Sequence, residues 1–247
     1  MAIGNFAQAS EPGIAPTGTL RAGYIMSNLA QAAKDSATGE FRGVSADIAR
    51  EFGRRNNVKV TILPLASAGA VLDAVRIGQI DIGFVATNPE RVGLVLNSQP
   101  YMFVQQSFLV RENSPIKSIV ELDRPGLTIG ANTNDTVAVY LKTWLKQATL
   151  KLSADFTVKE GAAWLADGTV VAFAGNRQRL AAATRGMGLR LLPDNLFGVS
   201  QTIAVANEKP ELLKAIDKAI DEMRASGFLQ AAVARSGVDG IDVAPKK

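Results

Sequence analysis

Residues 81–101 read DIGFVATNPERVGLVLNSQPY, and this stretch says most about the fold. It begins with a short apolar run, Asp81–Val85, of the kind that forms a buried strand. Small and polar residues follow, and they place one arginine, Arg91, close to the end of that strand. Arg91 could be a surface residue that pairs with Glu90 or another acid, or it could bind a ligand at the strand end.

The residues before this stretch alternate between strand and helix patterns. Apolar runs with strand character are followed by segments whose apolar residues recur with helical spacing. The predicted strands are Thr19–Ile25, Val58–Pro64 and Asp81–Val85, and the predicted helices are a segment that begins near Ser45 and Ala70–Ile77. Strands separated by helices in this order predict a parallel α/β sheet.

A second series of the same kind follows an extended segment, Gln105–Arg111. Its predicted strands are Leu127–Gly130, Val170–Ala174 and Leu189–Leu192, and its predicted helices are Asp135–Ala148 and Arg177–Thr184. Another extended apolar segment, Val199–Ala206, leads to a final helix that begins at Pro210 and ends near Gly227.

Two α/β units joined by two extended segments predict an α/β fold with two lobes, a two-stranded hinge and a ligand cleft between the lobes. We expect residues 1–18 to be flexible. Residues 19–104 together with 205–247 form the predicted first lobe, and residues 105–204, hinge strands included, form the second.

The composition excludes several kinds of site. The 247 residues include no cysteine and no histidine, so disulfides, thiol nucleophiles, Cys/His zinc sites and a Ser-His-Asp triad are excluded. No Asp-x-Asp-x-Asp-Gly calcium loop is present, and we predict no metal, no cofactor and no catalytic residue. The net charge of +4 comes without a clustered basic stripe, so we predict no nucleic-acid partner.

The first residues do not form an intact signal peptide, because no basic segment precedes an apolar core. Ala7-Gln8-Ala9 has the small-x-small form of a signal-peptidase site. It is either a coincidence in an alanine-rich chain or the remainder of a truncated export signal.

Several segments, in order, resemble the type II periplasmic solute-binding proteins of ABC importers, in the branch of polar amino-acid-binding proteins (family 3). The resemblance extends from Thr19 to Ser236. The similar segments are GTLRAGY, GEFRGVSADIAREFGRRNNVKVTILPL, AVRIGQIDIGFVATNPERVGLVLNSQPY, IKSIVELDRPGLTIGANTNDT and KPELLKAIDKAIDEMRASGFLQAAVARSG. The resemblance implies a periplasmic protein, expected to be a monomer, whose lobes close by hinge motion on a small carboxylate-bearing solute and deliver it to an ABC permease at the membrane.

In the first lobe, Arg91 matches the family arginine that clamps the carboxylate of the solute. A guanidinium suits this role because its planar donors bind a carboxylate bidentately and it stays charged. Ala86 and Thr87 match strand-end positions that help to hold the same carboxylate. Asn28 is the predicted polar contact after the first strand, and Phe84 is either an aromatic wall of the site or a core residue.

In the second lobe, Asn132, Asn134 and Thr136 lie where a strand runs into a helix, and a helix start attracts anions. Residues here could equally serve only as helix caps, and Asp135 would repel an anion if it faced the solute.

Asn176 and Arg177 depart most clearly from the family pattern. Family members that bind amino acids commonly have an aspartate at the position of Asn176, where it pairs with the α-ammonium of the solute. Asparagine supplies no charge there. If Arg177 also faces the solute, two cations without an acid favour a mono- or dicarboxylate, whereas an exposed helix-start arginine implies nothing about the solute.

The sequence is also compatible with two other functions. Some relatives are cyclohexadienyl dehydratases, which need an acid that protonates a leaving hydroxyl, and only Asp135 is a candidate for that acid. A ligand-binding sensor domain is the second alternative. A LysR-type effector domain shares the two-lobe plan, but no helix-turn-helix segment precedes the domain here.

Overall fold

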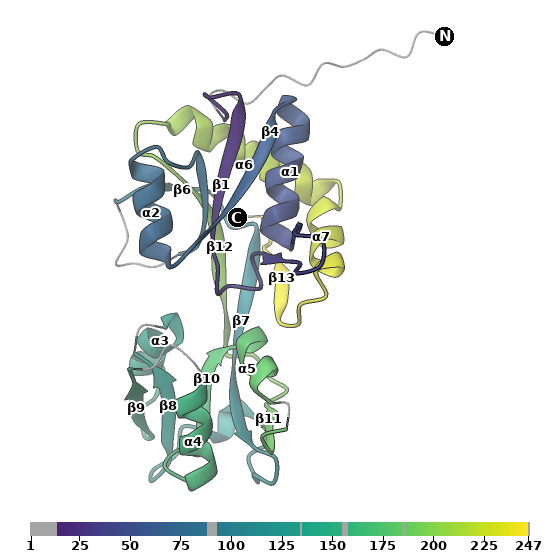
Figure 1. Cartoon of the computed structure of the whole chain (residues 1–247). Helices are drawn as coiled ribbons and strands as arrows, with labels where there is room; N and C mark the ends of the chain where they lie inside the picture. Colours follow the sequence, from purple (N-terminus) through teal and green to yellow (C-terminus); the bar gives the residue numbers. More distant parts are fainter. Residues whose placement is uncertain (1–13, 88–92, 134, 155–157, 185, 247) are drawn as a thin grey trace. The chain divides into compact units, whose positions relative to one another are not determined.

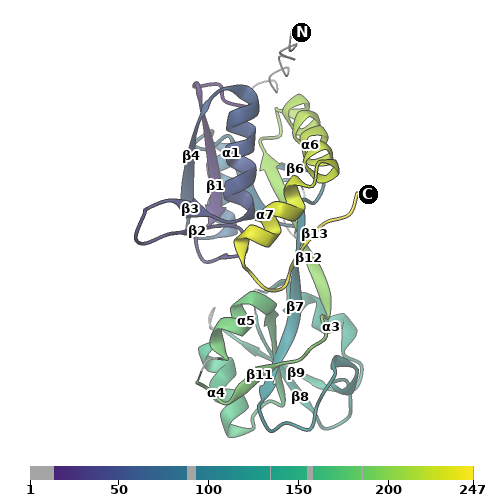
Figure 2. The same cartoon turned by 90° about the vertical axis from the view of Figure 1, so that its right-hand side faces the viewer.

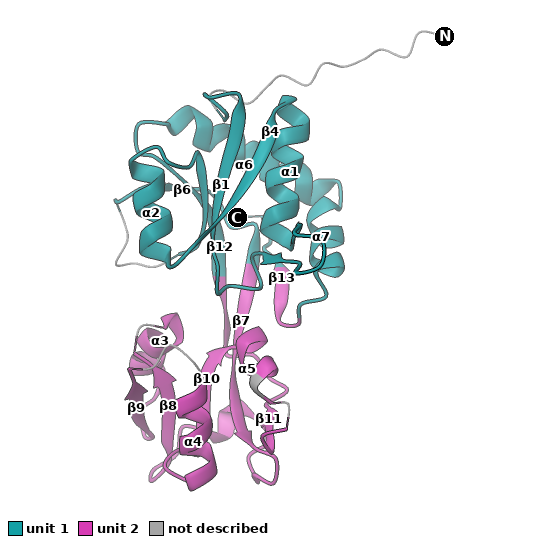
Figure 3. Ribbon diagram, in the orientation of Figure 1, with its two compact units in different colours: residues 1–102, 200–238, 243–247 teal, residues 103–199, 239–242 magenta. Residues whose placement is uncertain are grey.

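The computed structural model describes residues 14–87, 93–133, 135–154, 158–184 and 186–246. Of the predicted site residues, Arg91 and Asn134 lie outside these ranges. The chain divides into two compact units (Figure 3). Unit 1 contains residues 1–102, 200–238 and 243–247, and unit 2 contains residues 103–199 and 239–242. Within the described ranges, no helix combines the length and the apolar character that a membrane crossing requires.

Unit 1 is built on parallel strands β1, β4 and β5. β1 pairs with β4 from Thr19↔Lys59 to Ile25↔Leu65 and with β5 at Ala22↔Ile82. The elements of this unit are β1 (Thr19–Ile25), β2 (Ala33–Lys34), β3 (Phe41–Arg42), α1 (Val44–Asn56), β4 (Lys59–Leu65), α2 (Ala68–Arg76), β5 (Ile82–Ala86), β6 (Leu96–Asn97), α6 (Pro210–Ala225) and α7 (Phe228–Ser236). Three further strands have residues in both units: β7 (Met102–Arg111), β12 (Phe197–Val205) and β13 (Ile241–Val243).

The helices of unit 1 cover its sheet. α1 packs on β1 and β4 and also contacts α7, while α2 packs on β5. Figure 1 shows α1 and α2 on opposite sides of β1 and β4. Close packing requires glycine at Gly83, because a Cβ there would lie 2.6 Å from a methyl group of Val71 on α2. The parallel order of strands and the helical cover are those that the sequence pattern predicts.

One buried ion pair fastens the first strand of this sheet. The Asp81 side chain is fully buried and accepts hydrogen bonds from the backbone N–H of Arg21 (2.8 Å) and from its guanidinium (2.6 and 3.0 Å). The hydrogen bond to Asp81 raises the pKa of the Arg21 guanidinium. The pair therefore links β1 to the start of β5, near the amino-terminal ends of these parallel strands.

Unit 2 repeats the pattern with parallel strands β8, β9 and β10. β8 pairs with β9 from Thr128↔Thr149 to Asn132↔Ser153 and with β10 at Ile129↔Ala172. The remaining elements are a 3-10 helix (Ile119–Glu121), β8 (Thr128–Asn132), α3 (Thr136–Trp144), β9 (Thr149–Ser153), α4 (Lys159–Asp167), β10 (Ala172–Asn176), α5 (Arg177–Ala183), β11 (Leu189–Leu191) and β13 (Ile241–Val243).

Two apolar clusters cover the two faces of this sheet. Phe108 and Ala172 belong to the cluster that packs under α3, whereas their neighbours Leu109 and Phe173 belong to the cluster under α4 and α5. Successive residues of a strand point to opposite faces, so both faces of these strands are buried. Figure 2 shows α3 on one side of the strands and α4 and α5 on the other.

The second unit differs from the sequence prediction between residues 145 and 169. We expected one helix over Asp135–Ala148, but α3 ends at Trp144, and β9 and α4 follow it. The Asp123 carboxylate accepts hydrogen bonds from the backbone N–H groups of Lys146, Gln147 and Ala148 at 2.8–3.0 Å. These N–H groups are therefore not available for the hydrogen bonds that would extend α3. The same hydrogen bonds lower the pKa of the Asp123 carboxyl.

A short C-terminal segment, Asp239–Asp242, belongs to unit 2, although α7 before it and residues 243–247 after it belong to unit 1. Its strand β13 pairs with β7. Gln105 donates its backbone N–H to the carbonyl of Gly240 (2.8 Å) and its side-chain amide to Asp242 (2.6 Å). From the sequence we expect all of 205–247 to lie in the first lobe.

Candidate functional site

The carboxyl ends of the parallel strands in unit 1 carry a cluster of amide side chains. β1 ends at Ile25, and Asn28 lies in the turn that follows. The Oδ1 atom of Asn28 is buried and has no hydrogen-bond partner among the described residues. A buried carbonyl oxygen without a partner is costly, so this atom is a ready acceptor for an ammonium, hydroxyl or amide group of a ligand.

Two glutamines that are not among the residues predicted from the sequence support this turn. Gln31 is fully buried; its Oε1 accepts a hydrogen bond from the backbone N–H of Ile25 (3.1 Å), and its Nε2 donates to Oε1 of Gln201 (3.0 Å). Gln201 lies opposite Ala86 in the pairing of β12 with β5. The glutamine pair therefore links the end of β1 to β12, next to the end of β5. The sequence gives little sign of this pair, because each glutamine stands alone among small residues, Gln31 between two alanines and Gln201 between Ser200 and Thr202.

The predicted contacts at the end of β5 occupy different environments. Thr87 is exposed, its backbone N–H donates to the carbonyl of Ser200 (2.9 Å), and Ala86 before it is half-buried. Phe84 is only 2 % exposed and packs edge-on against Tyr101 with ring centroids 5.7 Å apart. Burial raises the pKa of the Tyr101 phenol, which hydrogen-bonds the Ser45 hydroxyl at 2.8 Å. Of the two roles considered for Phe84, this position is that of a core residue.

Unit 2 presents a second polar edge at the carboxyl ends of β8, β9 and β10, which end at Asn132, Ser153 and Asn176. Asn132 is 2 % exposed, and Asn176 is the N-cap of α5, where its Oδ1 accepts from the backbone N–H of Arg179 (3.3 Å). The predicted contact Thr136 opens α3 and is half-buried. The Ser153 hydroxyl is hydrogen-bonded to the Glu160 carboxylate in the first turn of α4.

An ion pair between Asp135 and Arg179 joins the start of α3 to the start of α5. Both side chains are about 30 % exposed (27 % and 31 %), so they reach the surface at this edge. The Nε of Arg179 is buried and has no partner among the described residues. Gly175 leaves room for the guanidinium, since a Cβ at that position would lie 3.3 Å from one of its nitrogens. The structure thus places one acid and one cation together.

Arg177 makes different contacts from Arg179. Its guanidinium contacts Asp239 (3.2 Å), the carbonyl of Leu192 (3.0 Å) and Asn195 (3.3 Å), and its side chain is 16 % exposed. Residues two apart on a helix point in nearly opposite directions, which explains why the two arginines diverge. Arg177 therefore anchors the C-terminal segment within unit 2, and Arg179 is the arginine at the polar edge.

The structure thus brings the described candidates into two groups. Asn28, Ala86 and Thr87 lie at the carboxyl edge of the strands of unit 1, and Asn132, Thr136 and Asn176 lie at that of unit 2. Sequence reasoning did not identify Gln31, Gln201 or Arg179, and it considered Asp135 without a partner. Within the described ranges, no cluster of three Asp or Glu side chains is arranged to hold a metal ion.

Comparison with models of protein families identifies one family. The model of the bacterial extracellular solute-binding proteins, family 3, matches residues 21–236. No curated protein sequence matches the chain.

Among solved structures, a putative ABC-transporter binding component from Wolinella succinogenes, complexed with lysine, is 25 % identical with a TM-score of 0.70, over 89 % of this chain and 95 % of that one. An ancestral arginine-binding protein bound to glutamine is 26 % identical with a TM-score of 0.66, over 89 % and 98 %. An ancestral amino acid-binding protein, a precursor of cyclohexadienyl dehydratase, shows the same fold at 23 % identity and a TM-score of 0.68, over 90 % and 96 %.

Proposed function

The chain belongs to the bacterial extracellular solute-binding proteins of family 3, and from that premise we propose that it captures a small carboxylate-bearing solute and delivers it to an ABC permease. The solute is an amino acid or a related organic acid, and the protein acts in the periplasm as a monomer. Arg91, which lies outside the described residues, clamps the carboxylate.

The observation that best supports this proposal is the polar edge in each unit. In open α/β sheets ligands bind at the carboxyl ends of parallel strands, and Asn28, Thr87, Asn132, Thr136 and Asn176 all lie at such ends. Asn28 adds a buried oxygen that needs a donor. We therefore retain these five residues as proposed solute contacts.

The charges at the edge of unit 2 support an amino acid over a dicarboxylate. The guanidinium of Arg177 donates to Asp239 and to the carbonyl of Leu192. Arg177 is therefore not available as the second cation that would favour a dicarboxylate. Asp135 instead brings a carboxylate to this edge beside Arg179. A paired anion and cation complement a zwitterion, whereas a second carboxylate on the solute would approach Asp135 unfavourably. The similar structures with lysine and glutamine are consistent with this choice.

A thermal-shift screen with amino acids and organic acids tests the proposal directly. A ligand that binds only the folded protein raises the melting temperature, by an amount that grows with its concentration. We expect a concentration-dependent increase with at least one amino acid and a smaller one with its deaminated acid. If no member of either set raises the melting temperature, the proposed solute class is wrong.

Replacing Asn176 with aspartate is expected to shift the preference further toward amino acids. A carboxylate at this position adds a charge-assisted hydrogen bond to the solute ammonium, which is roughly twice as strong as a neutral one. We expect the ratio of the affinity for an amino acid to that for its deaminated acid to increase about five- to tenfold. Isothermal titration calorimetry measures both affinities. An unchanged ratio would contradict the placement of Asn176 beside the ammonium.

Replacing Asp135 with asparagine is expected to move the same ratio in the opposite direction. The variant removes the acid and leaves the Arg179 guanidinium without its counter-ion, so carboxylates gain and amino acids lose, again by about five- to tenfold. Asp73→Asn is the matched control, because Asp73 is an exposed helix residue in the other unit, 70 % exposed in its side chain. Equal ratios for the two asparagine variants would exclude Asp135 from solute recognition.

A dehydratase on the same scaffold is the alternative function. It would need a carboxyl group that protonates a leaving hydroxyl. The acid considered for that role, Asp135, is held in an ion pair with Arg179, which suits electrostatic recognition better than proton donation. Chromatography of the solute after prolonged incubation separates the two functions: a binding protein returns it chemically unchanged.

A further inference from the structure

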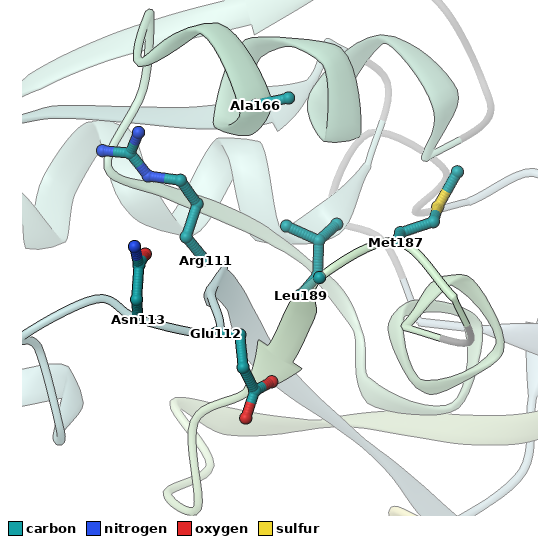
Figure 4. Close-up of a pocket in the computed structure, with 7 residues that line it drawn as sticks. Arg111, Glu112, Asn113, Ala166, Met187 and Leu189 are labelled. Atoms are coloured by element: carbon teal, nitrogen blue, oxygen red, sulfur yellow. The ribbon is translucent and has the colours of Figure 1, made fainter.

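Unit 2 contains two adjoining cavities at the amino-terminal ends of its parallel strands, opposite the polar edge described above. The larger has a volume of about 610 Å³, and its lining includes Leu127 and Val171, which directly precede β8 and β10. The smaller, about 400 Å³, is lined by Ala166 of α4 and by Met187 and Leu189 (Figure 4). Arg111, at the end of β7, lines both cavities.

Arg111 is unusual among the arginines of this protein. Within the part of the chain that the structure describes, it is the arginine whose guanidinium has neither an ion pair nor a hydrogen bond to the protein. Figure 4 shows the neighbouring Glu112 carboxylate pointing away from it, while the Asn113 amide lies on the same side as the guanidinium. A second arginine, Arg124, lines the larger cavity and makes a long contact of 3.9 Å with Glu121.

The wall of the larger cavity is held in place by hydrogen bonds that do not involve Arg111. Arg190 donates to the backbone carbonyls of Ser114 (3.0 Å) and Ile116 (2.6 Å). Glu121 accepts from the backbone N–H groups of Lys117 and Ser118, both at 2.9 Å, so its carboxylate is largely occupied. A wall fixed in this way gives a preformed site, which lowers the entropic cost of binding.

The chemistry of the lining selects one kind of ligand. Leu127, Val171 and Ile116 supply apolar surface, and the two guanidinium groups supply positive charge beside a single acid that is already hydrogen-bonded. A guanidinium matches a carboxylate with two parallel hydrogen bonds. We propose that this region of unit 2 is a second binding site, separate from the solute site, for a small organic carboxylate with an apolar body, and that Arg111 binds the carboxylate.

Titration of the ¹⁵N-labelled full chain with benzoate, followed by amide NMR, tests this site. We expect saturable shifts of the Asn113, Leu127 and Val171 signals, and much weaker shifts with benzamide, which has the same shape without the charge, and with inorganic phosphate, which has no apolar body. Arg111→Gln should weaken the benzoate affinity about tenfold, since a neutral donor replaces a charged one. Because the Arg111 guanidinium makes no hydrogen bond or ion pair within the described residues, this variant should fold normally.

The controls separate this site from the solute site. Arg91→Ala should leave the benzoate shifts at Asn113 and Val171 unchanged, and Arg124→Gln should weaken them less than Arg111→Gln does. Three results would overturn the proposal: no saturable shift at these residues, equal affinity for benzamide, or equal affinity of the Arg111→Gln variant for benzoate.

Discussion

Arg91→Ala is expected to reduce the affinity for the solute by at least about thirtyfold. Truncating one partner of a desolvated, hydrogen-bonded charge pair costs about 2–5 kcal/mol of binding free energy. A loss of about 2 kcal/mol corresponds to a roughly thirtyfold weaker affinity. The solute carboxylate would lose a bidentate partner that no other predicted residue of the first lobe replaces. Isothermal titration calorimetry, with the best solute from the thermal-shift screen, measures the change.

Two further variants make this result specific. Arg91→Lys keeps the positive charge but lacks the planar pair of donors, so its affinity should fall between those of the wild type and the alanine variant. Arg76→Ala is the matched control, because Arg76 is an exposed arginine of the same unit that pairs with Asp73 at 3.4 Å. Unaltered affinity of Arg91→Ala would remove Arg91 from the proposed site.

Phe173→Ala is expected to destabilise unit 2 by about 3–5 kcal/mol, the range for large buried aromatic side chains. Phe173 is fully buried between β8 and α4. Its ring fills space left by two glycines, since a Cβ at Gly130 or Gly161 would lie 2.6 or 2.4 Å from a ring atom. Both tryptophans of the chain, Trp144 and Trp164, lie in this unit, so urea unfolding followed by tryptophan fluorescence reports on it selectively.

A pair of companion variants tests the packing explanation. Val120→Ala, at a side chain 78 % exposed in the same unit, should change the stability by less than about 0.5 kcal/mol. Adding Gly161→Ala to Phe173→Ala should recover part of the lost stability, because the new methyl group enters the vacated space. If Phe173→Ala costs no more than Val120→Ala, the ring does not organise this core.

The sequence pattern predicts the architecture well because both units repeat strong local signals. The apolar run Thr19–Ile25 is a strand in the structure, Asp81–Val85 overlaps β5 (Ile82–Ala86), and the second series begins after Gln105–Arg111 as expected. The predicted bounds of an element are wrong where a side chain far away along the sequence determines where that element ends. The helix expected to reach Ala148 ends at Trp144 because Asp123, more than twenty residues earlier, takes the N–H groups that follow.

The same limit applies to the candidate site. A sequence shows that Arg177 and Arg179 both lie in the first turn of a helix, but it does not show which one faces the polar edge. The deciding contacts are Asp239 for Arg177 and Asp135 for Arg179, which are 62 and 44 residues away along the chain. The unsatisfied oxygen of Asn28 and the glutamine pair that supports its turn likewise arise only from tertiary packing.

The assignment of Asp239–Asp242 to unit 2 has a consequence for folding during synthesis. Unit 2 needs these residues, and unit 1 needs residues 200–238 and 243–247, so neither unit is complete while residues 239–247 are still inside the ribosome. Domains built from one continuous segment can fold one after another as they emerge. Here the contacts of Gln105 and Arg177 with Asp242 and Asp239 form only once this segment has emerged, so the two units complete their folding together rather than one after the other.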